Sequence, residues 1–135
     1  MQIKASNLDK MIPQARKTGK ISVFLGGDCH DNDWREALEK EFPDILFLDP
    51  YDEDWRPEKN IYGELIGMSV ADYVVFYKGG SGSKMEKKFL DSTGGSYKEF
   101  DDLKKLGKYI DGLSKPKQSP AGQLRKVARL LLLEE

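Results

Sequence analysis

A carboxylate follows a glycine-rich turn in the segment Gly79–Glu86, which reads Gly-Gly-Ser-Gly-Ser-Lys-Met-Glu. The hydrophobic run Tyr73–Tyr77 comes just before this turn. A buried strand that leads into a glycine-rich turn and then into a helix is where α/β proteins place ligand sites. Glycine lets the backbone approach a ligand closely, and a carboxylate such as Glu86 can attack or stabilise a sugar carbon. Taken alone, the pattern is more typical of a plain strand-to-helix turn that carries a solvated glutamate.

A second glycine turn, Gly26-Gly27-Asp28, follows the hydrophobic run Ile21–Leu25. This context is typical of a loop that binds phosphate or sugar, although the three-glycine dinucleotide fingerprint is absent. The one histidine, His30, adjoins the one cysteine, Cys29, and we expect both to be ordinary loop residues. We expect no metal and no cofactor, because a zinc site needs more cysteine or histidine ligands. The acidic stretch Asp49–Asp54 lacks the spacing of a calcium loop and is expected to be solvated.

The composition is typical of one small soluble domain. The 135 residues are enough for a single hydrophobic core, and 22 basic residues nearly balance 23 acidic ones. A balanced charge does not attract nucleic acid or an anionic membrane surface, so neither partner is expected. A single cysteine excludes an internal disulfide framework and fits a reducing compartment. Since the sequence shows no leader and no apolar run of membrane-spanning length, it predicts a cytoplasmic protein.

Hydrophobic runs alternate with helical patterns along the middle of the chain. The strands are expected at 21–25, 45–48 and 73–77. The helices are expected at 33–42, 57–70, 83–90 and 100–110. Helical crossovers make consecutive strands parallel, so the predicted fold class is α/β, an open parallel sheet with helices on both faces. In the helix 57–70, Ile61, Leu65 and Met68 are expected on the inner face.

The ends of the chain differ in pattern from the middle. The predicted divisions are a helical extension at 1–20, the α/β domain at 21–113, a linker at 114–120 and an amphipathic C-terminal helix at 121–135. No strand is visible between Asp91 and Tyr97. The apolar stripe of the last helix can pack on the sheet, on a second subunit or on another partner, and packing on the sheet is the simplest of the three.

Several short motifs occur in one order along the chain. They are Val23–Gly27, Trp34-Arg35, Asp49-Pro50 with Asp54-Trp55, Glu64–Met68 with Ala71-Asp72, and Gly82–Glu86. Over about residues 20–93 this set resembles the nucleoside 2-deoxyribosyltransferase-like family, whose members include 2'-deoxynucleoside 5'-phosphate N-hydrolases. The resemblance implies a Rossmann-like (flavodoxin-like) sheet. It also implies an enzyme of nucleotide metabolism, a transferase or a hydrolase, that acts on the N-glycosidic bond of a small-molecule nucleoside or nucleotide.

The resemblance also assigns roles to individual residues. Glu86 matches the nucleophile that attacks the anomeric carbon, and Glu64 matches the helix acid that binds and protonates the nucleobase. From its position alone, Glu64 is expected at the surface. The residues that match the substrate-binding positions are Phe24, Gly26, Gly27, Asp28, Asp72, Gly82 and Ser83. Asp72 is also suited to a structural hydrogen bond at the entry to its strand.

The sequence departs from the family pattern at Phe24, Gly80, Lys87 and Lys88, where tyrosine, aspartate and small residues are usual. Gly80, Lys87 and Lys88 favour a first alternative, a nucleotide-binding module that keeps the pocket without turnover. A second alternative is an interaction protein that acts through its C-terminal helix. The nucleobase, and the choice between water and a second base as acceptor, are not determined by the residues.

We predict that the functional unit is a homo-oligomer, most simply a homodimer. A small sheet with short helices leaves a shallow cleft, whereas small-ligand sites bury most of the ligand. A two-fold contact through the apolar stripes around Ile61–Met68 and Leu124–Leu131 would wall the cleft and cover both stripes. The resemblance implies the same arrangement. Light scattering over a micromolar concentration series tests the prediction, and a mass that stays near 15.3 kDa would contradict it.

Overall fold

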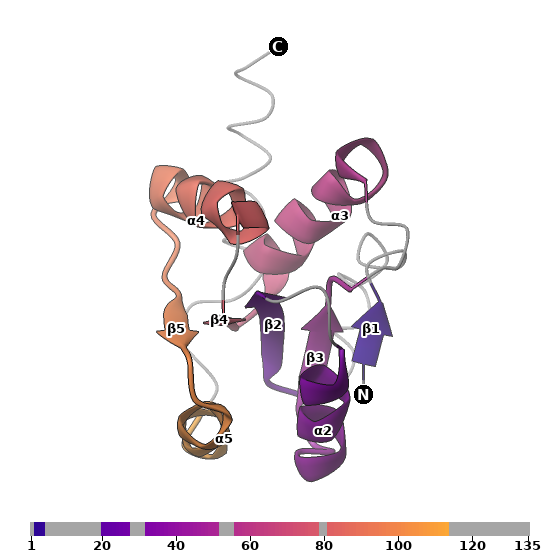
Figure 1. Cartoon of the computed structure of the whole chain (residues 1–135), viewed down its shortest axis with the longest axis vertical. Coiled ribbons are helices and arrows are strands. Elements are labelled where there is room, and N and C mark those ends of the chain that lie inside the picture. The colour runs from indigo at the N-terminus through magenta and orange to yellow at the C-terminus, as the bar shows by residue number, and fades with distance from the viewer. Residues whose placement is uncertain (1, 5–19, 28–31, 52–55, 79–80, 114–135) are drawn as a thin grey trace.

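The computed structural model describes residues 2–4, 20–27, 32–51, 56–78 and 81–113, which form strands and helices in alternation (Figure 1). The strands are β1 (Gln2–Lys4), β2 (Ser22–Gly27), β3 (Leu46–Asp49), β4 (Tyr73–Tyr77) and β5 (Lys98–Phe100). The helices of the described part are α2 (Asp33–Glu41), α3 (Pro57–Val70), α4 (Ser81–Thr93) and α5 (Leu103–Asp111).

The strands form one parallel sheet in the order β1-β3-β2-β4-β5. From β2 onward, this order is that of a flavodoxin-like sheet, with β1 added outside β3. The chain moves from β2 to β3 on one side and then returns to β4 on the other, so the order reverses at β2. The predicted fold class, an open parallel α/β sheet with helices on both faces, is confirmed.

Two hydrophobic clusters cover the two faces of the sheet. Helices α3 and α4 lie on one face and α2 and α5 on the other (Figure 1). The first face buries Phe24, Met68 and Phe76, and the second buries Leu38 and Leu106 with their neighbours. Successive side chains of a strand point to opposite faces, which is why the hydrophobic runs of the central strands are almost unbroken.

The carboxyl-terminal edge of the sheet opens between β2 and β3. The pairing of these two strands ends at Phe24 and Leu48. The pairing of β2 with β4 continues to Gly27 and Tyr77. The last residues of β2 therefore have a strand partner on the β4 side, while on the β3 side the ladder has stopped. A crevice at the reversal of strand order is the usual position of a ligand in open α/β sheets.

Two edge strands were not expected from the sequence. Gln2–Lys4 lies in the predicted helical extension 1–20 but pairs with Phe47–Asp49 as β1. Lys98–Phe100 forms β5 next to β4, although Lys98 and Glu99 are exposed. Strands of three residues depend on the backbone partners that the sheet offers, and these partners are far away in the sequence. Residues 5–19, the predicted linker 114–120 and the predicted helix 121–135 lie outside the described residues.

Helix α3 faces the sheet with polar as well as apolar side chains. Asn60 and Glu64 are 1% and 3% exposed, whereas Ile61 and Leu65 are half-buried. Asn60, Glu64 and Met68 are spaced four residues apart and share one stripe of the helix. Met68 is buried as predicted, and Leu65 packs against the cluster on this face. The prediction missed Asn60 and Glu64, which are buried more deeply than Ile61 and Leu65. Within the described part of the chain, no helix is long and apolar enough to span a membrane.

Candidate functional site

Glu86 is buried at the carboxyl-terminal edge of β2. It lies in the second turn of α4, with 8% of its surface exposed. A β-carbon built on Gly26 would lie 3.3 Å from the Glu86 Oε2 atom, so this carboxyl group rests against the backbone of Gly26. Among the described residues, Glu86 Oε2 is a buried oxygen with no hydrogen-bond partner. A buried acceptor without a partner costs free energy, and a ligand that donates a hydrogen bond would recover it.

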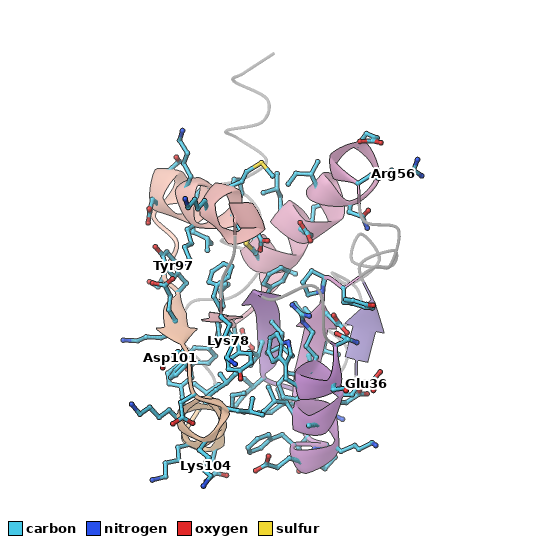
Figure 2. All side chains as sticks on the ribbon, viewed as in Figure 1. Glu36, Arg56, Lys78, Tyr97, Asp101 and Lys104 are labelled. Carbon is cyan, nitrogen blue, oxygen red and sulfur yellow. The ribbon has the colours of Figure 1, made fainter. Side chains whose placement is uncertain are left out.

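Gly26 and Gly27 are glycine for steric reasons. A β-carbon on Gly26 would lie 2.5 Å from the Phe76 ring, which packs edge-on against Tyr97 at 5.5 Å (Figure 2 labels Tyr97). Gly27 has a φ of +120°, and a β-carbon there would lie 2.0 Å from the Tyr77 carbonyl oxygen. Gly26 thus allows Glu86 to approach the backbone of β2 closely. Contact with a ligand stays a prediction.

Glu64 faces Glu86 from the neighbouring helix. Its carboxylate is the second cause, after burial itself, that raises the pKa of Glu86. The surface position expected from local sequence is therefore wrong, and the structure brings the two candidate catalytic carboxyl groups together. Asn60, one turn before Glu64, accepts a hydrogen bond at its Oδ1 atom from the Arg56 backbone N–H at 3.0 Å.

Burial raises the pKa of Glu86 to about 8. The Glu64 carboxylate adds to this rise, while the positive charges of Arg35 and Lys87 oppose it. Desolvation and a like charge both disfavour the ionised carboxylate, and a nearby cation favours it. The Glu86 carboxyl group is therefore largely protonated near neutral pH. Paired carboxyl groups with separated ionisation are typical of acid–base sites.

Arg35 and Asp49 form a buried ion pair at the same edge. They are 1% and 0% exposed, and the Arg35 Nε atom lies 3.5 Å from Asp49 Oδ1. Arg35 Nε also donates a hydrogen bond to the Leu25 carbonyl at 3.0 Å, and Asp49 accepts one from the Tyr51 backbone N–H at 2.8 Å. The prediction of a solvated loop from Asp49 onward is wrong for Asp49.

The sequence did hold a signal for this pair. Asp49 directly ends the buried strand β3, and carboxyl ends of parallel strands meet at one edge of the sheet. Arg35 follows Trp34 on the side of α2 that carries buried residues. A charged residue on such a helix side is almost never fully buried unless it is paired.

Two predicted substrate-binding residues, Phe24 and Asp72, are engaged by contacts within the protein. Phe24 is fully buried in the hydrophobic cluster under α3 and α4, so it serves as packing. Asp72 precedes β4 at the amino-terminal edge, where its Oδ2 atom accepts from the Ser22 N–H at 3.0 Å. The Asp72 N–H donates to Ser22 Oγ at 2.9 Å. Asp72 therefore joins the starts of β2 and β4, and the structural role expected for it is confirmed. It also lines a cavity of about 300 Å³, whose wall includes Tyr97 and Tyr109 and, from α4, Phe89 and Leu90.

Two further predicted substrate-binding residues lie at the start of α4. Gly82 and Ser83 belong to the first turn of α4, which begins at Ser81, earlier than predicted. Asp28 lies outside the described residues. Lys87 forms an ion pair with Glu99 and lies 5.5 Å from the centre of the Phe76 ring. Within the described ranges, no three His, Cys, Asp or Glu side chains are grouped closely enough to hold a metal ion.

No family model, curated protein or solved structure matches the chain.

We predict that Gly26→Ala lowers the free energy of unfolding and disturbs the site. The added methyl group would overlap the Phe76 ring, which Tyr97 and Lys87 hold in place, and would press on Glu86. Overpacking of this kind costs about 1 to 3 kcal/mol. Urea unfolding measures the change.

Gly107→Ala is the matched control for this variant. Gly107 lies inside α5, and a β-carbon there meets nothing within 4 Å. The same substitution should therefore stabilise the protein by about 0.5 to 1 kcal/mol. Equal effects of the two substitutions would contradict the packing of Gly26 described above.

We predict that Glu86→Gln stabilises the protein at neutral and mildly alkaline pH. The pKa of Glu86 is raised from 4.5 to about 8, so its contribution to stability is fully present below pH 4.5 and is lost as pH rises through about 8. Glutamine has no proton to lose, and each pKa unit corresponds to about 1.36 kcal/mol. The free energy of unfolding of the variant should exceed that of the parent by an amount that grows over this pH range to a few kcal/mol. Urea unfolding at several pH values measures the difference.

Glu36→Gln serves as the control, because Glu36 is exposed on α2 (Figure 2). It removes the same charge in water and should give no comparable change with pH. A Glu86→Gln variant that is less stable than the parent at pH 8 would show that the carboxylate is a structural group.

Proposed function

We propose that this protein is a nucleoside 2-deoxyribosyltransferase-like enzyme that cleaves, or transfers at, the N-glycosidic bond of a deoxynucleoside or its 5'-monophosphate. The observation that carries the proposal is the buried pair Glu64 and Glu86, with Glu86 Oε2 resting against Gly26 where the strand order reverses. Substrate sites of open α/β sheets lie at this position. Two carboxyl groups with different ionisation are what glycosidic bond cleavage requires.

The proposed reaction proceeds in two steps. In the first, an ionised Glu86 oxygen forms a bond to the anomeric carbon as the bond from that carbon to the nucleobase nitrogen breaks. The electron pair of the broken bond stays on the base, which takes a proton from Glu64. In the second step, water or another nucleobase attacks the same carbon, Glu64 accepts its proton, and Glu86 leaves as a carboxylate. Atoms, charge and protons balance over both steps.

The proposed division of roles places the proton on Glu64 in the substrate complex, whereas Glu86 carries it in the unliganded protein. One proton on two carboxyl groups leaves one group ionised as a nucleophile and the other protonated as an acid. Full ionisation above the raised pKa of Glu86, about 8, removes the proton that the leaving base needs. A second proton at low pH removes the nucleophile. A bell-shaped pH profile of kcat/KM with its alkaline limb near pH 8 is therefore expected.

The raised pKa of Glu86 also favours a second candidate function. In the unliganded protein, the proton resides mainly on Glu86, and a protonated carboxyl group is not a nucleophile. A module that binds a nucleoside or nucleotide through this acid, without turnover, would show such an ionisation. Equilibrium binding of a nucleotide in the absence of any base release distinguishes this candidate from the enzyme.

Chromatography of free base released from a panel of deoxynucleosides and their monophosphates measures the activity. Glu86→Gln should lower kcat/KM by about 1,000-fold or more, because a nucleophile is lost. The exposed control Glu36→Gln should leave it unchanged. An active parent with an equally active Glu86→Gln variant would remove Glu86 from the mechanism.

Glu64→Gln tests the acid separately. General acid catalysis contributes about 100- to 10,000-fold when the leaving group is poor. The loss should therefore be large with a natural base and small with an activated, p-nitrophenyl-type leaving group. Equal losses on both substrates would assign Glu64 a structural role instead.

A further inference from the structure

Arg35 occupies the place where the sheet opens beside the site. The pairing of β2 with β3 ends at Phe24 and Leu48, and the Arg35 guanidinium joins the two strands just beyond that point. Its Nε atom donates to the Leu25 carbonyl of β2 at 3.0 Å and lies 3.5 Å from Asp49 Oδ1 of β3. The guanidinium thus connects β2 and β3 through side-chain contacts, just beyond the last backbone pair of the two strands.

The guanidinium is held on its other sides by its own helix. Its Nη1 atom donates to Asn32 Oδ1 at 3.4 Å, and its central carbon lies 4.3 Å from the centre of the Trp34 ring. A planar fork with several donors suits such a site, whereas a lysine ammonium is a point charge on a flexible stem. The position of the positive charge is therefore defined by α2, β2 and β3 together.

The charges around Glu86 come from three helices. Within the described residues, the groups that act on it are Glu64 from α3, Arg35 from α2 and Lys87 from α4 itself. Gly26 and Phe76, from β2 and β4, contribute no charge. Lys87 is partly exposed and paired with Glu99, whereas Arg35 is 1% exposed. A buried charge is screened less by solvent than an exposed one, so Arg35 is the more effective of the two cations.

We propose that Arg35, oriented by Asp49, is a positioning residue of the site, which holds the separated ends of β2 and β3 and supplies the positive charge that lets Glu64 and Glu86 retain one negative charge when buried. The effect expected on catalysis rests on the proposed function. The effect expected on the ionisation of Glu86 concerns the unliganded protein alone. The two effects can therefore be tested separately.

The direct test is the titration of Glu86 in the full chain. Carbon NMR of protein labelled at the glutamate side-chain carboxyl carbons follows the ionisation, and Glu86→Gln identifies the signal. Loss of a neighbouring cation should move the midpoint of Glu86 upward by about one pH unit or more in Arg35→Met. Arg35→Lys keeps the charge and should restore most of the parent midpoint. An unchanged midpoint in Arg35→Met would overturn the proposal.

Arg56→Met is the matched control. Arg56 lies at the far end of α3, with 64% of its side chain exposed (Figure 2). The substitution changes the net charge as Arg35→Met does, but water and salt screen an exposed charge, so the Glu86 midpoint should not move. An equal shift in both variants would show a general effect of net charge and would also overturn the proposal.

A second variant keeps the proposal testable if Arg35→Met does not fold. Arg35→Met leaves Asp49 buried without its cation, which is strongly destabilising. The double variant Arg35→Met/Asp49→Asn removes both charges and avoids this penalty. Its Glu86 midpoint should shift in the same direction as in Arg35→Met, and an unchanged midpoint here again overturns the proposal.

The kinetic readout separates this proposal from the proposed function. If the parent releases base, both limbs of the pH profile should move to higher pH in Arg35→Met and return toward the parent in Arg35→Lys. Base release with an unmoved profile contradicts the proposal but leaves the function intact. If the parent releases no base, the proposed function fails, while the NMR titration still decides the role of Arg35.

Discussion

The contact between Glu86 and Gly26 is the constraint on which the rest of the site depends. A carboxyl group can rest against β2 at this point because Gly26 presents no side chain, and the Phe76 ring fills the space next to it. Burial there deprives the carboxyl group of water and leaves its Oε2 atom without a hydrogen-bond partner in the described structure. The raised pKa follows from this burial first and from the Glu64 carboxylate second.

The charged residues of the site form one connected system. Asp49, Glu64 and Glu86 are buried acids, and Arg35 is the fully buried cation among the described residues that lies with them. Charges this deep are tolerated when they are paired, hydrogen-bonded or neutralised by a proton. Arg35 and Asp49 are paired and hydrogen-bonded, and Glu86 is neutralised by a proton. Such an arrangement lowers stability relative to an apolar edge, as is usual where a site is kept for function.

The two edges of the sheet have different roles. At the amino-terminal edge, Ser22 and Asp72 exchange hydrogen bonds and join the starts of β2 and β4. At the carboxyl-terminal edge the strands separate, and polar side chains from α2, α3 and α4 fill the opening. The parallel topology produces this asymmetry, because every strand ends, and every crossover helix begins, at the same edge. Residues that follow strands are thereby gathered into one site.

Local sequence was enough to predict the alternation of strands and helices, the three central strands and the position of Glu86 after a glycine-rich turn. These features depend on local periodicity and on glycine, which a short window of sequence contains. The edge strands β1 and β5, the deep burial of Glu64 beside Met68, and the contacts that join Arg35 to Asp49 became visible only in the tertiary structure. Each of these depends on partners far away in the sequence. The ionisation of Glu86 belongs to the second group, since desolvation and neighbouring charge exist only once α2, α3 and α4 are packed on the sheet.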